Sequence, residues 1–397
     1  MKRQIAHKLR VLSLSTLYPN AITPNFGVFV ERQMQAVVAR GDIDLVMVSP
    51  VGLPPFPLSL HPRYRALRGL ARVEQRGGVS IHRPRFSLLP GTGGRFNARL
   101  ESAAVLPLAR KLHAEQPFDL VDAQFFYPDG PAALRIAREL GLSCSIKARG
   151  ADVHYWGHAS GTARQVRDAA LGASGLLAVS SGLADDLAAL GAERAKITVH
   201  RTGLDRTMFR PLDRAECRRK LDLPLDRPVL ACVGALIERK GQRFAIEALA
   251  HIPGALLVLA GAGPDEARLR GLAGRLGLAD RVHFLGAVPH GDLPVLLSAA
   301  DLLVLPTASE GLANVWVEAL ACGTPVVTTP IPGAQELLTD PAYGRMVKRD
   351  PVAIATAVNE LLASPPARDA VLAGAAAFSW EANAAALVAY WRALAAK

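Results

Sequence analysis

Short apolar runs alternate with segments of helical periodicity along the chain, and this alternation occurs twice. The runs are rich in Val, Leu and Ile, which is typical of parallel strands that are buried on both faces. In the first half we expect strands at residues 9–15, 44–48, 79–82, 119–123, 143–147, 176–179 and 197–199, and helices that include 28–39, 131–140 and 183–190. In the second half we expect strands at residues 229–233, 256–260, 282–285, 302–305 and 326–328, and helices that include 242–249, 266–276 and 315–321.

This pattern predicts an α/β protein with two doubly wound, Rossmann-like domains. The chain has 397 residues, and one hydrophobic core rarely extends beyond ~250–300 residues. We expect a first domain at residues 1–210, a second at 211–375, and a C-terminal segment at 376–397 whose helix crosses back to the first domain. Ligands of such folds bind outside the carboxyl ends of the strands, so a cleft between two facing domains is the expected site.

Positive charge is concentrated in the first half of the chain. The net charge is +11; residues 1–210 carry +12 and the remainder −1. Nine arginines and one acidic residue lie between positions 63 and 99. A basic amphipathic helix is predicted from the spacing of Arg65, Arg68, Arg72 and Arg76. A solvated face and docking on an anionic membrane are the leading interpretations, and nucleic-acid binding is disfavoured because no aromatic stacking motif is present.

The cysteines and the apolar runs indicate the cellular compartment. Cys144, Cys217, Cys232 and Cys322 have no paired spacing, which is typical of a reduced intracellular protein. No apolar run approaches the ~18–20 residues that span a membrane, and residues 1–17 lack a small-residue cleavage site. We expect a cytoplasmic protein, held at the inner face of the plasma membrane if the basic segment docks there.

The motif richest in candidate chemistry runs from residue 306 to residue 325. It reads as a strand end, a glycine-bearing loop and a helix, with Glu310 in the loop and Glu318 about one turn into the helix. A helix N-terminus offers free backbone N–H groups to phosphate, and a carboxylate accepts two hydrogen bonds from a vicinal diol such as ribose. The loop and helix start also contain Gly311, Leu312, Asn314 and Val315.

Two further strand ends in the second half carry candidate ligand-binding residues. Gly234 ends a strand, and Lys240 opens the next helix, where an ammonium group suits a diphosphate. Gly261 begins a stretch that resembles a dinucleotide fingerprint, but Glu266 stands where the third glycine is needed. Because acidic residues there repel a pyrophosphate, a nicotinamide cofactor is not expected.

Two strand ends in the first half of the chain also carry candidate ligand-binding residues, a glycine and an arginine. Gly27 follows the first strand and permits close approach of backbone N–H groups to an anion. Arg149 follows the strand at 143–147 and either faces the cleft or pairs with Asp152. His154 and His158 lack a third ligand, so no metal site is expected.

The combined motifs resemble the family 4 retaining glycosyltransferases, which have the GT-B fold. The resemblance rests on Glu310 and Glu318 with seven residues between them, on residues 234–241, on Gly27 and on residues 179–211. Residues 26–30 and 149–153 most resemble the branch of teichuronic acid biosynthesis enzymes and other bacterial surface-polysaccharide transferases.

The resemblance implies transfer of a sugar from a UDP- or GDP-sugar to a glycan or polyprenyl-linked acceptor, with retention of configuration. Because the sequence has no metal signature, we expect the reaction to need no metal and no cofactor. Glu318 resembles the ribose-binding glutamate, and Glu310 resembles the glutamate that contacts the donor sugar. Lys240 is similar to the diphosphate-binding lysine, and Gly27 to the glycine that approaches the donor phosphate. Residues 286–288, which end at Val288, are similar to the segment that lines the nucleobase.

Departures from the family pattern leave the donor open. Ala235 stands where many members have a phosphate-binding arginine, and Arg239 is the candidate substitute. Arg149 stands where many have a histidine near the reacting sugar. We expect Lys240, Glu310 and Arg149 to act in catalysis. The alternatives are a nucleotide-sugar 2-epimerase, which would act on the donor alone, and a non-catalytic nucleotide-sugar-binding protein.

Overall fold

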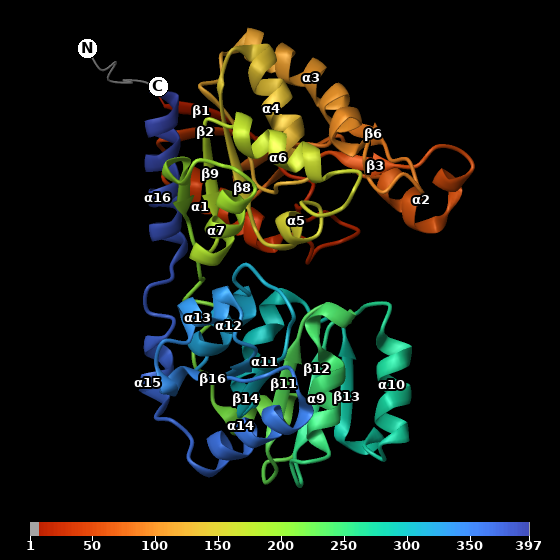
Figure 1. Ribbon diagram of the computed structural model, residues 1–397, viewed down its shortest axis with the longest axis vertical. Helices are drawn as coiled ribbons and strands as arrows, with labels where there is room; N and C mark the ends of the chain where they lie inside the picture. The colour runs from red at the N-terminus through yellow and green to blue at the C-terminus, as the bar shows by residue number, and fades with distance from the viewer. Residues whose placement is uncertain (1–7, 397) are drawn as a thin grey trace. The chain divides into compact units, whose positions relative to one another are not determined.

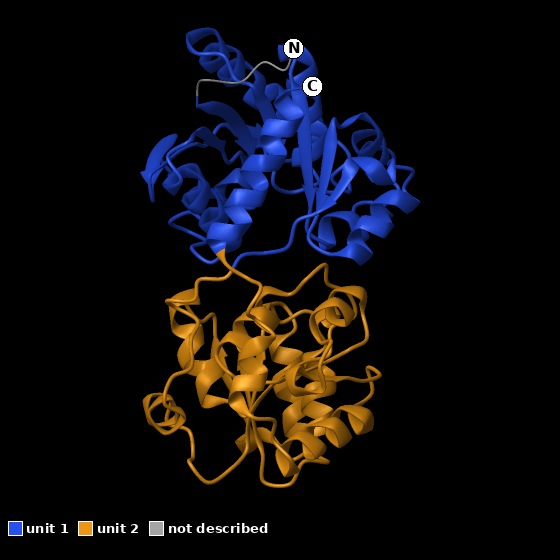
Figure 2. Cartoon of the chain, turned by 90° about the vertical axis from the view of Figure 1, so that its left-hand side faces the viewer, with its two compact units in different colours: residues 1–203, 380–397 blue, residues 204–379 orange. Residues whose placement is uncertain are grey.

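The computed structural model describes residues 8–396, and the chain forms two compact units. Unit 1 contains residues 1–203 and 380–397, and unit 2 contains residues 204–379 (Figure 2). Residues 1–7, the start of the stretch in which the sequence analysis found no small-residue cleavage site, lie outside the described residues. Within residues 8–396, no helix is both long and apolar enough to cross a bilayer.

Unit 1 contains an eight-stranded sheet in the order β10-β9-β8-β7-β1-β2-β5-β4. Adjacent strands are parallel except the edge pair β4–β5, which is antiparallel. The strands are β1 (Leu9–Leu14), β2 (Ile43–Val48), β4 (Val73–Arg76), β5 (Val79–His82), β7 (Leu120–Ala123), β8 (Ser143–Ala148), β9 (Gly175–Ala178) and β10 (Ile197–Val199). A separate parallel pair joins β3 (Val51–Leu53) and β6 (Arg85–Ser87).

The helices of unit 1 include the last helix of the chain. They are α1 (Val28–Ala39), α2 (Pro62–Arg68), α3 (Asn97–Glu115), α4 (Asp129–Leu140), α5 (Ala151–His154), α6 (Ala163–Gly172), α7 (Ser181–Ala189) and α16 (Trp380–Ala395). Helix α16 lies beside α1 and buries Leu387, Val388 and Trp391 in the core that also contains β1 and β2 (Figure 1).

The prediction of one basic helix through Arg65, Arg68, Arg72 and Arg76 is wrong in its second half. Helix α2 ends at Arg68, and Arg76 lies on β4, which pairs with β5 across the turn at Gly77 and Gly78. Both glycines have positive φ, 57° and 79°, which suits a two-residue hairpin turn. The guanidinium of Arg76 also forms an ion pair with Glu31, so Arg76 does not share the exposed face of α2.

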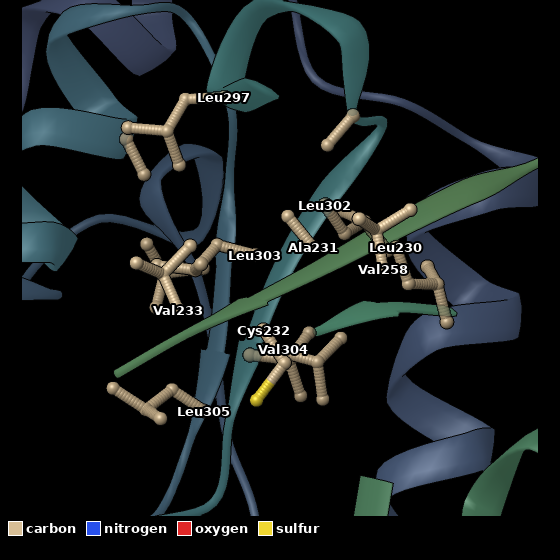
Figure 3. Close-up of a cluster of buried hydrophobic side chains, with 14 of the residues drawn as sticks. Leu230, Ala231, Cys232, Val233, Val258, Leu297, Leu302, Leu303, Val304 and Leu305 are labelled. Atoms are coloured by element: carbon tan, nitrogen blue, oxygen red, sulfur yellow. The ribbon is translucent and has the colours of Figure 1, made fainter. Parts of the chain in front are cut away.

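Unit 2 contains a six-stranded parallel sheet in the order β13-β12-β11-β14-β15-β16. Its strands are β11 (Val229–Val233), β12 (Leu256–Ala260), β13 (Val282–Gly286), β14 (Leu302–Leu305), β15 (Val326–Thr328) and β16 (Gly344–Met346). Its helices are α8 (Arg214–Lys220), α9 (Gln242–Leu249), α10 (Glu266–Arg275), α11 (Leu293–Ala299), α12 (Asn314–Ala321), α13 (Pro332–Leu337), α14 (Pro351–Ala363) and α15 (Arg368–Ala373). Side chains of β11 and β14 pack with Val258 and Leu297 in a fully apolar core (Figure 3).

Both sheets wind outward in two directions from their first strand. In unit 1 the chain runs from β1 to β2 and later restarts on the other side at β7. In unit 2 it runs from β11 to β12 and β13 and restarts at β14. The crevices where α/β sheets bind ligands therefore lie at the carboxyl ends of β1 and β7 and of β11 and β14.

Candidate active site

In unit 2, three of the predicted site residues meet at one carboxylate oxygen. Lys240 lies in the loop after β11, and Glu310 lies in the loop after β14, on the two sides of the switch point. Lys240 Nζ donates to Glu310 Oε1 at 2.5 Å, and Arg239 Nη1 donates to the same oxygen at 2.9 Å. The two cations face one carboxylate, so the cluster carries one positive charge in excess, as an anion site requires.

A third donor to this oxygen is Thr307, which the sequence analysis missed. Thr307 is fully buried, and its Oγ1 donates to Glu310 Oε1 at 3.0 Å. Arg239 is in addition hydrogen-bonded to the carbonyl of Ser309. These contacts hold the loop that connects β14 to α12. A single threonine two residues after a strand has no distinctive spacing, so the sequence offers no signal for this contact.

Two glycines bring the neighbouring loops close to Lys240. Gly234 has φ 147° and lies against the apolar stem of Lys240. A Cβ on Gly234 would lie 3.6 Å from the Lys240 Cδ atom. A Cβ on Gly261 would lie 1.9 Å from the carbonyl oxygen of Gly234, so no side chain fits there. Gly234 and Gly261, both predicted to bind the donor, therefore allow the loop after β11 and the loop after β12 to lie in close contact.

Glu318 lies on α12 and is hydrogen-bonded to a histidine that the sequence analysis did not select. The distance from Glu318 Oε1 to His290 Nε2 is 2.8 Å, and the Glu318 residue is only 8% exposed. The His290 ring also contacts the Phe209 ring, with centroids 5.1 Å apart. His290 lies two residues after Val288, which packs against the core of unit 2. The histidine fixes one oxygen of the predicted ribose-binding carboxylate.

The start of α12 leaves its first amides without a side-chain cap. Ala313 occupies the N-cap position and has no side-chain acceptor for the N–H groups of the first turn, which contains Asn314 and Val315. Gly311 is buried, and Leu312 packs partly buried against the core of unit 2. The first turn therefore offers backbone N–H groups, as an anion site at a helix N-terminus does.

The predicted residues of unit 1 lie at the carboxyl end of its own sheet. Gly27 is the N-cap of α1 with φ 81°, and a Cβ there would lie 2.4 Å from the Leu17 carbonyl oxygen. Arg149 Nη2 donates to Gln124 Oε1 at 2.7 Å and to Gln33 Oε1 at 3.0 Å. Asp152 accepts the backbone N–H groups of Arg149 and Gly150. Among the described residues the Arg149 guanidinium forms no ion pair with Asp152, so the alternative of an Arg149–Asp152 side-chain pair is wrong.

The sequence analysis also missed Lys147, a fully buried lysine two residues before Arg149. Lys147 Nζ lies 2.6 Å from His200 Nδ1, and His200 Nε2 lies 2.9 Å from the carbonyl oxygen of Asn383 on α16. Burial lowers the pKa of Arg149 to about 10, and burial together with Lys147 lowers the pKa of His200 to about 2. His200 is therefore neutral; Nε2 donates to Asn383, and Nδ1 accepts from Lys147.

Comparisons with family models and with known proteins identify the family of the chain. The model for glycosyl transferases group 1 matches residues 213–376, and a glycosyl transferase 4-like domain matches residues 26–203. A Bacillus subtilis protein named for teichuronic acid biosynthesis, the glycosyltransferase TuaC, is 30% identical over 338 residues, which cover 83% of each chain. A Mycobacterium tuberculosis D-inositol 3-phosphate glycosyltransferase is 39% identical over 215 residues, 51% of this chain and 45% of that protein.

Solved structures share the fold over nearly the whole chain. Sucrose-phosphate synthase of Thermosynechococcus elongatus superimposes with a TM-score of 0.80 at 23% identity, covering 97% of this chain and 99% of that one. Anabaena HepE, solved in complex with UDP, gives a TM-score of 0.74 at 20% identity and covers 97% and 100%. These likenesses and the two doubly wound sheets confirm the predicted GT-B fold. The family matches and the 30% identity to TuaC show that the chain belongs to the group 1 glycosyltransferases.

Proposed function

We propose that the protein transfers a sugar from a nucleoside-diphosphate donor to a glycan or polyprenyl-linked acceptor in bacterial surface-polysaccharide synthesis, with retention of configuration. The observation that carries the proposal is the cluster of Lys240, Arg239 and Glu310 beside the switch point of unit 2. The UDP complex of HepE and the name of TuaC support the donor class and the polysaccharide product.

Breaking a sugar–phosphate bond leaves negative charge on the departing nucleoside diphosphate. The Lys240 ammonium, the Arg239 guanidinium and the free amides at the start of α12 are the groups that would stabilise this charge. They are held before the reaction by Glu310 and by the α12 helix, so little reorganisation is required. One such fixed donor contributes about 2.7–4 kcal/mol to transition-state stabilisation in other enzymes. We propose that no metal ion is needed for this step.

Glu318 is the proposed acceptor for the ribose hydroxyl groups of the donor. His290 binds one carboxylate oxygen at 2.8 Å, which orients the side chain before the donor arrives. A carboxylate that accepts hydrogen bonds from both ribose hydroxyls would discriminate against a donor that lacks them.

Retention requires attack on the face from which the nucleotide departs or a covalent intermediate. Glu310 Oε1 accepts hydrogen bonds from Lys240, Arg239 and Thr307, which makes this oxygen a weak nucleophile. We therefore propose same-face attack by the acceptor hydroxyl. Arg149, held by Gln33 and Gln124, is proposed as a further cation that acts in catalysis. We propose that the transfer takes place at the cytoplasmic side of the membrane.

A thermal-shift panel of nucleoside diphosphates and nucleotide-sugars tests the donor class, because a ligand that binds the native state raises the melting temperature by mass action. We expect a UDP- or GDP-linked ligand to raise it and the matching free sugar to leave it unchanged. No shift with any nucleoside diphosphate contradicts the proposal.

Proton NMR of the donor and the product separates the remaining alternatives. With donor alone, a 2-epimerase interconverts two nucleotide-sugars, whereas a transferase leaves the sugar configuration unchanged. With an acceptor, we expect the anomeric configuration of the donor in the product, at an initial rate that EDTA does not alter. An inverted product contradicts retention, and loss of rate with EDTA contradicts metal independence.

A further inference from the structure

One segment of unit 1 exposes apolar and basic side chains together. Between β3 and β4 the chain forms a short 3-10 turn at Leu58–Leu60 and then α2; we call residues 54–72 the edge segment. In this segment the exposed fractions of Phe56, Leu58 and Leu60 are 78%, 52% and 48%. Three large apolar residues are therefore solvent-exposed within five positions, whereas most others on the described surface stand singly.

The basic side chains of the edge segment have no acidic partners. No Asp or Glu occurs between Asp44 and Glu74. Glu74 forms an ion pair with Arg83, with 2.6 Å between Glu74 Oε1 and Arg83 Nη2. Among the described residues, no ion pair involves the exposed arginines of the segment, which are Arg63, Arg65, Arg68 and Arg72. The segment therefore carries a concentrated and uncompensated positive charge.

The edge segment is anchored by three buried residues, Pro54, Ser59 and Leu70, while the apolar side chains on both sides of Ser59 are exposed. Arg85 Nη2 donates to the Leu70 carbonyl oxygen at 2.5 Å. None of the α2 residues is buried, and α2 contacts the 3-10 turn and β3 (Figure 1). The fold thus presents α2 and the three apolar side chains on its surface instead of packing them into the core.

We propose that the edge segment docks on an anionic lipid bilayer, with Phe56, Leu58 and Leu60 inserted among the lipid headgroups and Arg63, Arg65 and Arg68 against the lipid phosphates. Apolar side chains next to arginines are the combination that an interfacial membrane site requires. A twofold contact between two copies of the segment would bring like charges together, which disfavours self-association. This proposal does not depend on the proposed sugar transfer.

Vesicle flotation of the full chain tests the proposal. We expect the protein to float with phosphatidylcholine vesicles that contain phosphatidylglycerol, and at least tenfold less with pure phosphatidylcholine vesicles. The triple variant R63Q/R65Q/R68Q and the triple variant F56S/L58S/L60S should each reduce the bound fraction at least tenfold. High salt should weaken wild-type binding because electrostatic attraction to the lipids is screened.

Matched variants outside the segment serve as controls. L225S/V352S replaces two apolar residues of unit 2 that are 54% and 58% exposed, and R164Q/R167Q removes two exposed arginines of α6. Both should float like the wild type. All variants replace exposed side chains, so their melting temperatures should match the wild type and exclude misfolding as a cause.

Insertion is measured separately with F56W, whose emission should shift to the blue when anionic vesicles are added. The proposal is overturned if the wild type does not float with anionic vesicles or if the F56S/L58S/L60S variant floats as well as the wild type. The proposal is also overturned if light scattering shows that the wild type is a dimer and the F56S/L58S/L60S variant is a monomer. The edge segment would then be a dimer interface.

Discussion

The Lys240 ammonium has two anionic partners in the proposed reaction cycle. Without donor it is bound by Glu310 at 2.5 Å, and with donor it would face the diphosphate. Its stem lies against Gly234, so its position is set by packing as well as by charge. The carboxylate therefore holds the ammonium in place before a donor binds.

We predict that K240M lowers turnover at least tenfold, and by about 10²–10³-fold if Lys240 contributes as one fixed oxyanion donor does in other enzymes. Methionine keeps the apolar stem over Gly234 and removes the charge, so the melting temperature should stay close to that of the wild type. Release of nucleoside diphosphate under steady-state conditions measures the effect.

The matched control is K220M on α8, where the lysine is exposed and paired with Glu216 at 3.0 Å. This variant should retain wild-type turnover. Wild-type turnover by K240M would show that Lys240 does not stabilise the leaving group.

The sequence motifs contained Lys240, Arg239 and Glu310, which the structure brings into contact, but they did not predict the contacts themselves. Lys240, Glu310 and Glu318 occur in motifs at strand ends, and such motifs have recognisable spacing. His290 and Thr307 do not, because each is a single polar residue that reaches its partner only after the sheet has formed. Their roles depend on tertiary contacts between segments that are separate in sequence.

At the scale of elements, the apolar runs located the central strands of both sheets, and the helical periods located helices such as α1, α9 and α10. The sequence analysis did not name the 19-residue helix α3 or the 13-residue helix α14. The largest error concerned residues 65–76, where arginines at helical spacing predicted one helix. The turn at Gly77 and Gly78 and the alternation of residues 79–82 are hairpin signals that compete with this pattern. β4 is an edge strand with only four residues, and its pairing with β5 outweighs its weak local periodicity.

Helices α3 and α4 are joined by two buried carboxyl groups. Glu101 on α3 and Asp129 at the start of α4 are both fully buried, and Asp129 Oδ2 accepts the Thr16 N–H at 2.9 Å. Burial and the neighbouring carboxyl group raise the pKa of Glu101 well above its usual range, and burial raises the pKa of Asp129 to about 7. The native pair therefore retains protons near neutral pH that the unfolded chain releases above pH ~4.

We predict that E101Q reduces the loss of stability that this pair causes as pH rises. Because the native state binds more protons, its free energy of unfolding falls between pH ~4 and pH 7, by ~1.4 kcal/mol for each unit of pKa difference. Glutamine removes one titrating group and donates to Asp129. Urea unfolding at pH 5 and pH 8 should show a smaller decrease for E101Q than for the wild type.

The control for this prediction is E115Q, at the exposed C-terminal end of the same helix. Its decrease between pH 5 and pH 8 should equal that of the wild type. An equal decrease in E101Q would place the origin of the pH dependence elsewhere.

At the scale of the whole molecule, the C-terminal helix completes unit 1. Helix α16 lies outside both family matches, yet it fills the core of unit 1 with Leu387 and Trp391. Trp391 Nε1 donates to Asp122 Oδ1 at 3.0 Å, and Gln124 Nε2 donates to Asp122 Oδ2 at 2.7 Å. Gln124 in turn accepts from Arg149, so a continuous hydrogen-bond network connects the last helix to the candidate cation of unit 1.

We predict that W391F destabilises unit 1 by about 1–3 kcal/mol, because the buried Asp122 loses a hydrogen-bond donor while the aromatic packing is largely retained. W316F is the matched control: Trp316 on α12 is also fully buried, but its Nε1 has no hydrogen-bond partner among residues 8–396. Hydrogen exchange should show lost protection at β1 and β7 in W391F alone. Equal loss of stability in both variants would assign the effect to ring volume, and the network from α16 to Arg149 would then have no energetic role.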